Sequence, residues 1–440
     1  MKPDKQNLPP STSTPSLLPG LSLRVNFSWT FAGNMIYAAS QWGMLVVLAK
    51  LGSPEMVGQF GLGLAVTAPV IMLSNLALRT VQATDARQEY VFGDYLGLRL
   101  ITATLALLVI AGIVFLSGYR QESALIILVV GLAKVFEAIS NVFYGFIQQH
   151  ERMDHIAISR MIKGPLSLVA LALGVYLTGS VLWGAVGLVV VWAGLLLGYD
   201  MRSTLTIVRS HPQQYTDTTL RPRWHLPTLA RLSWLALPLG LVLMLISLNT
   251  NIPRYFIEHE LGEYDLGIFA ALAYLIVAGN MIIDALGQAA IPRLAKYYAA
   301  GKRSAFIKLL IKLTGFGAAI GAAAITAAAL AGELLLTLLY DAEYARQDLL
   351  VWLMVAAAIS YVASFLSRGV TAARYFRVQL PLFLCVTGST VLLSFWLIPA
   401  MGLQGAAFAL ITSACIQMIG YIAILAHALH NLVPGEETES

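Results

Sequence analysis

The connections between the apolar segments of this chain alternate between loops rich in Lys and Arg and loops almost free of them. With the chain divided into twelve apolar segments, 23 of its 28 Lys and Arg residues fall in the N-terminal tail and at the even-numbered connections. Basic loops stay on the cytoplasmic side of a membrane, so this alternation is typical of a protein that crosses the bilayer many times. The same rule predicts that both termini are cytoplasmic.

The apolar segments are long enough to cross a hydrocarbon core, which takes roughly 20 residues as a helix. Composition agrees, because 58% of the residues are hydrophobic and only 12% are charged, against about 25% charged in soluble domains. We therefore predict an all-α integral membrane protein. Its twelve transmembrane helices are expected near residues 26–49, 57–78, 100–118, 124–147, 158–178, 182–199, 232–250, 266–289, 309–330, 349–367, 379–397 and 403–426.

The longest basic connection divides the predicted spans into two groups of six. It contains Pro212, Pro222 and Pro227, a spacing that no single regular element tolerates. The first residues of the chain are rich in Pro, Ser and Thr, which cannot form an apolar core. We expect a disordered cytoplasmic tail over 1–23, a six-helix bundle over 24–199, a cytoplasmic linker over 200–231, a second six-helix bundle over 232–427 and a cytoplasmic tail over 428–440.

A weak repeat relates the two groups of spans. Residues 51–60 (LGSPEMVGQF) follow the first span, residues 261–269 (LGEYDLGIF) follow the seventh, and one deletion aligns them. A second pair lies at the last hairpin of each group, where residues 181–187 (VLWGAVG) resemble residues 402–407 (GLQGAA). Since each group would begin and end on the cytoplasmic side, the repeats are predicted to be parallel, related by an axis along the membrane normal.

Together with residues 333–345 (ELLLTLLYDAEYA) and the basic stretch 301–312 (GKRSAFIKLLIK), these segments resemble a known family. It comprises the oligosaccharide-lipid and polysaccharide exporters, including O-antigen flippases, of the multidrug/oligosaccharidyl-lipid/polysaccharide (MOP) superfamily. The resemblance covers nearly the whole chain. It implies two pseudo-symmetric bundles around a central cavity, alternating access, and the cytoplasmic (inner) membrane of a bacterium. It further implies a lipid-linked oligosaccharide substrate, contact with membrane lipids, and other polysaccharide assembly proteins as partners.

The sequence lacks the motifs of several kinds of chemistry. The chain has no Gly-x-x-x-x-Gly-Lys-Ser/Thr loop for nucleotide phosphates, and its short outer connections leave no exposed domain for an acceptor glycan. Both cysteines, Cys385 and Cys415, fall inside spans. We expect no catalytic residue, no metal and no cofactor, and a coupling ion, H⁺ or Na⁺, is left open. Topology and anionic lipid head groups explain the positive net charge, so no nucleic-acid partner is expected.

Charged side chains inside spans are costly and often line a transport path. Lys134 and Glu137 lie three residues apart in the fourth span, within reach of an ion pair; a structural pair and a role in the transport cavity are both open. Asp284, near the inner end of the eighth span, serves proton coupling or pairs with an arginine at the inner end of a span. Arg254 follows a polar run after the seventh span, against the charge rule, and is a candidate for the outer end of a cationic path.

Arginines and amides complete the candidate substrate-binding residues. Arg24, Arg79 and Arg368 lie at inner ends of spans, where snorkelling to head groups explains them and where a guanidinium also suits a pyrophosphate. Amides suit sugar hydroxyl groups and hydrogen bonds between helices equally well. The resemblance implies that the first spans of both halves line one cavity. The amides in the first two spans of each half are Asn34, Gln41, Asn75, Asn249, Asn251 and Asn280.

These features predict a flippase that moves an isoprenoid-pyrophosphate-linked oligosaccharide from the cytoplasmic to the outer leaflet, for O-antigen, capsule or exopolysaccharide synthesis. An inside-negative potential favours outward movement of negative charge by about 2.3 kcal/mol per charge per 100 mV. The alternative is a cation-coupled multidrug exporter of the same superfamily, which would want acidic residues in its first span, where this chain has none. An integral membrane glycan polymerase or ligase is a third hypothesis.

Overall fold

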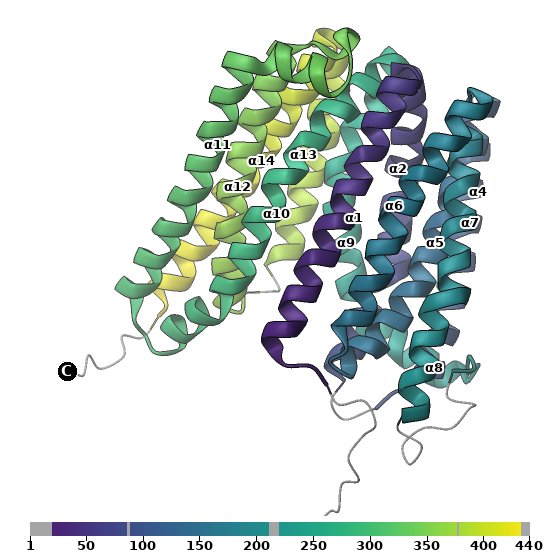
Figure 1. Cartoon of the computed structure of the whole chain (residues 1–440). Coiled ribbons are helices and arrows are strands. Elements are labelled where there is room, and N and C mark those ends of the chain that lie inside the picture. The colour runs from purple at the N-terminus through teal and green to yellow at the C-terminus, as the bar shows by residue number, and fades with distance from the viewer. Residues whose placement is uncertain (1–19, 86–88, 211–219, 376–377, 433–440) are drawn as a thin grey trace, which may run out of the picture.

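The computed structural model describes residues 20–85, 89–210, 220–375 and 378–432, and within these ranges all regular structure is helical (Figure 1). Twelve helical segments there are long and apolar enough to cross a membrane. The prediction of an all-α membrane protein with twelve spans is confirmed. The outer parts of both predicted tails (1–19 and 433–440) and the centre of the predicted linker (211–219) lie outside the described residues.

Both ends of the predicted linker, residues 200–231, are helical in the structure. An amphipathic extension of the sixth span buries Ile207 and Val208, and Pro227 is tolerated in the first turn of the seventh. The helices of the first half are α1 (Leu23–Leu51), α2 (Pro54–Asn75), α3 (Leu78–Thr84), α4 (Phe92–Ser117), α5 (Gln121–Gln149), α6 (Met153–Thr178), α7 (Val181–Leu195), the π-helical turn η1 (Leu196–Asp200) and α8 (Met201–Ser210). Those of the second half are α9 (Leu226–Leu261), α10 (Glu263–Ala299), α11 (Arg303–Leu339), the short 3₁₀ turn η2 (Ala342–Tyr344), α12 (Gln347–Ala372), α13 (Gln379–Met401) and α14 (Leu403–His430).

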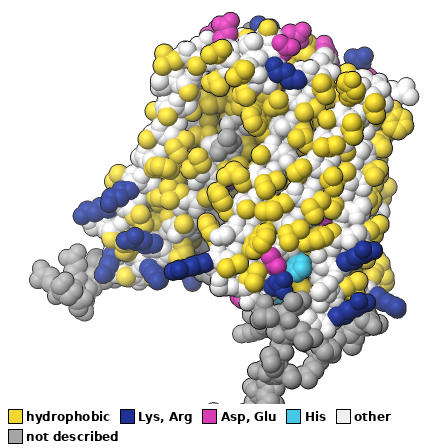
Figure 2. Space-filling view, viewed as in Figure 1, with side chains coloured by type: hydrophobic (Ala, Val, Ile, Leu, Met, Phe, Trp, Pro, Cys, Tyr) yellow, Lys and Arg dark blue, Asp and Glu magenta, His cyan; other side chains and the backbone are white. Residues whose placement is uncertain are grey.

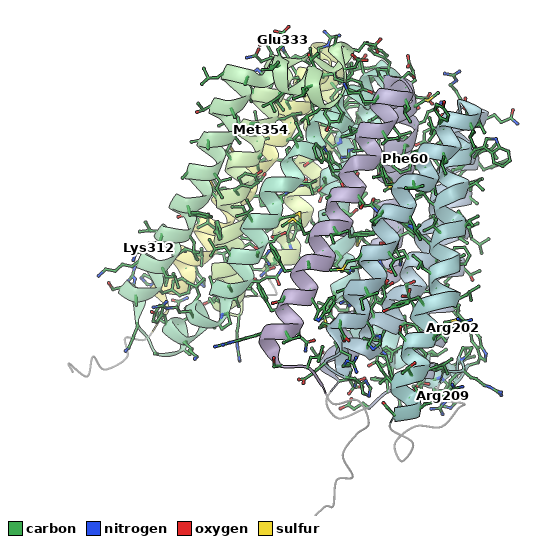
Figure 3. All side chains as sticks on the ribbon, viewed as in Figure 1. Phe60, Arg202, Arg209, Lys312, Glu333 and Met354 are labelled. Carbon is green, nitrogen blue, oxygen red and sulfur yellow. The ribbon has the colours of Figure 1, made fainter. Side chains whose placement is uncertain are left out.

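The helices run between two ends of the molecule that differ in charge. We call the end that carries the connections after α3, α5, α8, α10 and α12 the basic end, and the other the opposite end. In Figure 2 most Lys and Arg side chains gather at the basic end, below, and hydrophobic side chains cover the surface between the two ends. Figure 3 places Arg202, Arg209 and Lys312 at the basic end and Glu333 at the opposite end. The distribution follows the charge pattern of the sequence.

Both halves pack their helices in the same order. In the first half, α6 packs along α1 and α7, and α5 contacts α2, α4 and α7. In the second half, α13 packs along α9 and α14, and α12 contacts α10, α11 and α14. Counted by span, these pairs correspond one to one. The predicted pair of pseudo-symmetric six-helix bundles is therefore confirmed.

The two repeat segments touch each other where α2 crosses α10. A Cβ atom on Gly58 would lie 1.9 Å from the carbonyl oxygen of Glu263, and one on Gly267 would lie 1.8 Å from that of Pro54. Glycine is needed here because any side chain would hold the two backbones apart. Gly58 and Gly267 occupy equivalent places in the aligned repeats, so the crossing lies close to the axis that relates the halves.

Polar contacts beside this crossing join the halves at the opposite end. Gln59 Nε2 donates to Glu263 Oε2 at 3.1 Å, and the Ser123 hydroxyl donates to the other oxygen of the same carboxylate. Every residue from Leu266 to Leu272 is buried. Towards the basic end the two bundles spread apart (Figure 1), except at the start of α9, where Leu232 packs in one core with Leu96 of α4.

Candidate functional site

A cavity of about 270 Å³ lies inside the second half, between α9, α10, α12, α13 and α14. Three predicted residues line it: Asn249 and Arg254 from α9, and Asn280 from α10. Ser360 and Gln417 add polar groups from α12 and α14. Among the described residues that line this cavity, none is Asp or Glu. The cavity therefore combines a positive charge with neutral hydrogen-bonding groups.

Arg254 supplies that charge, and its Nε–H donor is not bonded to any described protein group. Its Nη1 donates to Asn251 Oδ1 at 3.0 Å, and Asn251 is fixed in turn by donating to the carbonyl oxygen of Ser247 at 2.8 Å. The buried Nε of Arg254 has no acceptor among the described residues. No described carboxylate forms an ion pair with this guanidinium. An anion in the cavity would meet an uncompensated cation.

The placement of Arg254 corrects the predicted end of the seventh span. That span was expected to end near residue 250 and to leave Arg254 in an outer connection, but α9 continues to Leu261. The polar run Asn249-Thr250-Asn251 lies inside the helix, and its first two residues line the cavity. The helix ends where Gly262 adopts a φ of +90°, a conformation open to glycine.

Two further candidates lie beside this cavity, towards the basic end. Asp284, one helical turn from Asn280 on α10, pairs with Arg368 of α12, with 2.7 Å between Oδ1 and Nη2. Of the two alternatives for Asp284, the ion pair with an inner-end arginine is present in the structure. The Asp284 side chain remains 52% exposed. On the other side, Asn249 accepts a hydrogen bond from the Thr390 hydroxyl of α13, which fixes its amide at the cavity wall.

The ion pair expected in the first half is also present. Lys134 Nζ lies 2.9 Å from Glu137 Oε2. The Tyr37 hydroxyl of α1 donates to the other carboxylate oxygen at 2.7 Å, and Lys134 Nζ lies 4.9 Å from the centre of the Trp192 ring of α7. The pair therefore links α5 to α1 and α7, and these residues lie in the other half from the Arg254 cavity.

The remaining candidates are dispersed over the first half. Arg24 is exposed at the start of α1 and lines a surface pocket with Met161. Gln41 Nε2 is buried without an acceptor in the described part of the chain. Asn75 accepts a hydrogen bond from Arg99 at 2.8 Å, which engages its amide oxygen in holding the fold. The last two candidates, Asn34 and Arg79, lie on α1 and α3 near the basic end.

The sequence pattern of the family described as "Polysaccharide biosynthesis protein" matches residues 23–298, more than half of the chain. The chain belongs to this family. The capsular polysaccharide biosynthesis protein CapF of Staphylococcus aureus is 29% identical to it over 398 residues, which cover 90% of this chain and 97% of that protein.

Two solved structures share the fold of this polysaccharide biosynthesis protein. The inward-facing conformation of a multidrug resistance MATE family transporter of the MOP superfamily matches with a TM-score of 0.72 and 16% identity, over 93% of this chain and 100% of that chain. The lipid II flippase MurJ, in an inward closed conformation, matches with a TM-score of 0.66 and 11% identity, over 93% of this chain and 91% of that chain. The chain therefore has the MOP fold.

The polysaccharide biosynthesis protein also contains a buried polar chain that the sequence did not reveal. Lys163 Nζ donates to the Tyr144 hydroxyl at 3.1 Å, and the Ser159 hydroxyl donates to Asp200 Oδ1 at 2.6 Å. The Tyr144 and Ser159 hydroxyls lie 2.7 Å apart, and because Ser159 has given its only hydroxyl hydrogen to Asp200, Tyr144 is the donor. Lys163 and Asp200 are almost fully buried. Lys163 falls inside the predicted fifth span (158–178) and Asp200 directly follows the predicted sixth (182–199), so the charges inside and next to these spans were the signal that would have found them.

Proposed function

We propose that this protein is a flippase that moves an isoprenoid-diphosphate-linked oligosaccharide from the cytoplasmic to the outer leaflet by alternating access, for the synthesis of a surface polysaccharide. The observation that carries the proposal is the cavity at Arg254, whose guanidinium has no carboxylate beside it among the described residues. Guanidinium groups bind phosphate oxygens through paired hydrogen bonds, and the amides of Asn249 and Asn280 suit sugar hydroxyl groups. The family and the fold shared with MurJ support a flippase.

In this proposal the basic end is cytoplasmic and the protein lies in the cytoplasmic membrane of a bacterium, with both termini inside. Basic loops are retained on the cytoplasmic side. The arrangement of the halves, spread apart at the basic end, then receives substrate from the inner leaflet. Transport follows when the halves close at the basic end and part beside Gly58 and Gly267. The membrane potential acts on the anionic substrate, and a coupling ion, H⁺ or Na⁺, is not required by this proposal.

The cavity gives less support to the two alternative functions. A cation-coupled multidrug exporter would use carboxylates to attract its cargo, and none lines the Arg254 cavity among the described residues. The likeness to a MATE transporter concerns the fold. Efflux of cationic dyes from cells tests this alternative directly. A glycan polymerase or ligase would lengthen or transfer the glycan, so product analysis separates it from a flippase, which only relocates it.

The test is transfer of a labelled lipid-linked oligosaccharide across vesicles that contain the purified protein. Wild-type protein is expected to accelerate transfer over empty vesicles. Arg254→Gln should slow it at least tenfold, because the diphosphate loses a charge-assisted hydrogen bond of about 1.5–3 kcal/mol. Arg303→Gln is the matched control, because Arg303 is exposed at the start of α11, and its rate should equal wild type. Transfer no faster than in empty vesicles would refute the proposal.

A further inference from the structure

The carboxylate of Glu263 belongs to the second half, but the described groups that donate to it belong to the first. Glu263 is the first residue of α10 and is 8% exposed. Gln59 Nε2 of α2 donates to Oε2 at 3.1 Å, and the Ser123 hydroxyl of α5 donates to Oε1. Arg120, the residue before α5, has its Nη1 3.8 Å from Oε2. Glu263 therefore depends on the other half for its hydrogen bonds.

The two hydrogen bonds matter more here than the ion pair. Arg120 is 80% exposed, and ion pairs that face water contribute little. A buried carboxylate, in contrast, is costly unless its oxygens accept hydrogen bonds. When the halves part at the opposite end, Gln59 and Ser123 leave with the first half, and water has to replace them.

The hydrogen bond between α1 and the second half behaves differently. Trp42 Nε1 of α1 donates to the Tyr340 hydroxyl at 3.2 Å, and that hydroxyl donates to the carbonyl oxygen of Ala271 at 2.9 Å. Both Tyr340 and Ala271 belong to the second half, so the tyrosine keeps its acceptor when α1 moves away. Glu263 keeps none of its described donors in the same movement.

The contact of Glu263 has no equivalent on the other side of the crossing. An added Cβ on Gly58 would meet the carbonyl oxygen of Glu263, and one on Gly267 would meet that of Pro54. Glu263 and Pro54 each lie four residues before the glycine of their own repeat, so they occupy equivalent places. Proline has no polar side chain. The contact therefore occurs once in the chain, and one substitution removes it.

We propose that the Glu263 carboxylate is the latch of the opposite end. Its hydrogen bonds with Gln59 and Ser123 hold this end closed while substrate enters at the basic end, and their loss is part of the step that opens it. The inference rests on the proposed function, because it assigns Glu263 to one step of the transport cycle. Glu263 is a positioning residue and does not touch the substrate.

Gln59 and Glu263 allow the latch to be broken and then rebuilt. Glu263→Gln replaces one acceptor oxygen by an NH₂ group, which then faces the NH₂ group of Gln59. Gln59→Glu places two like charges face to face. The double variant exchanges the two groups. The carboxylate at position 59 then accepts from the amide at position 263, whose oxygen still accepts from Ser123.

The experiment measures how fast a water-soluble maleimide labels a cysteine placed in the crossing. Ala270 is 3% exposed and faces Gly61 of α2, so Ala270→Cys reports parting of the halves. The full-length protein is used in nanodiscs without substrate, with Cys385 and Cys415 replaced by Ala. Labelling should be slow while Glu263 is intact.

Each single substitution in the latch should speed labelling by about tenfold, the effect of losing one hydrogen bond to a charged group. The double variant Gln59→Glu with Glu263→Gln should label as slowly as the starting protein. Glu333→Gln is the matched control, because it removes an exposed acid at the same end (Figure 3) and should leave the rate unchanged.

A cysteine at Ala106 separates opening of the latch from loss of structure. Ala106 is buried on α4, within the first half, and Ala106→Cys should stay unlabelled in every variant. Three results would overturn the inference. They are an unchanged rate at Ala270 in both single variants, a double variant that labels as fast as the single ones, and equal acceleration at Ala106. None is the failure of the proposed function, which is an absence of transport by wild-type protein in vesicles.

Discussion

Arg99 is 1% exposed and holds the end of α2. It donates to the carbonyl oxygens of Ser74 and Asn75 at 2.9 and 3.0 Å, and to Asn75 Oδ1 at 2.8 Å. The last carbonyl groups of a helix have no partner within the helix and carry a partial negative charge. Because its amide oxygen is used in this way, Asn75 has a structural contact, which was one of the two alternatives for the amides.

Replacing Arg99 by Met should strongly destabilise the protein. The change leaves buried acceptors at the end of α2 without donors, which we expect to cost about 3 kcal/mol in total, since one unsatisfied buried group costs roughly 1–3 kcal/mol. Thermal unfolding in detergent measures it. Arg303→Met, at an exposed position, serves as the control and should melt as wild type does. Equal melting temperatures for the two variants would show that Arg99 has no such role.

For single residues, the sequence predicts those contacts that form between neighbours on one helix. Lys134 and Glu137 were predicted to pair because a spacing of three residues places them on one face. Lys163 and Asp200 come from different helical segments, and no local pattern relates them. Lys163 and Arg99 were not among the predicted site residues, because the charge pattern gives the side of the membrane and not the direction of a side chain.

Helix α9 packs against both halves of the molecule. Near its start, Leu232 packs in a core with Leu96 of α4, and further along Asn249 contacts Thr390 of α13. Its interior contains Pro238, and proline removes a backbone hydrogen bond and permits a bend. The apolar pattern predicted this element as a span, but it contained no information on which half each end would contact.

The crossing of α2 and α10 can be tested with one methyl group. Gly267→Ala would force a Cβ to within 1.8 Å of the Pro54 carbonyl oxygen, so the helices must separate and the melting temperature should fall by several degrees. Gly315→Ala is the matched control in α11, because nothing lies within 4 Å of its added Cβ. That variant should be neutral or stabilised by up to about 1 kcal/mol through helix propensity. Similar melting temperatures for both variants would contradict the close crossing.

The molecule as a whole is two similar bundles that meet at the opposite end, where α2 crosses α10, and again at the start of α9, which packs against the first half. Twelve spans and parallel repeats could be predicted, because hydrophobicity, loop charge and repeated segments are all patterns along the chain. The closed opposite end could not be predicted, because the close contact of Gly58 with Glu263 joins two distant segments and leaves no pattern along the chain. The cavity inside the second half could not be predicted either, because five helices contribute to it.

If transport requires the halves to part at the opposite end, a covalent link there should stop it. A Cβ on Gly61 would lie 3.2 Å from the Cβ of Ala270, close to the separation of about 3.8 Å found in disulfides. Gly61→Cys with Ala270→Cys, in a background with Cys385 and Cys415 replaced by Ala, should lose lipid-linked glycan transfer when oxidised and regain it when reduced. Each single cysteine variant should be unaffected by oxidation. Transfer at the wild-type rate by the fully oxidised protein would mean that the halves do not part here.

Gly58 and Gly267 meet from equivalent positions of two repeats, as a residue on the two-fold axis of a dimer meets its own copy. A shorter ancestral chain of six helices would form this contact by pairing with a second copy of itself. In such a homodimer one mutation alters both sides of the interface at once. Fusion into one chain frees each side to change alone, and Gln59, which faces Glu263 while its repeat counterpart is Ile268, is the kind of difference that only the fused chain permits.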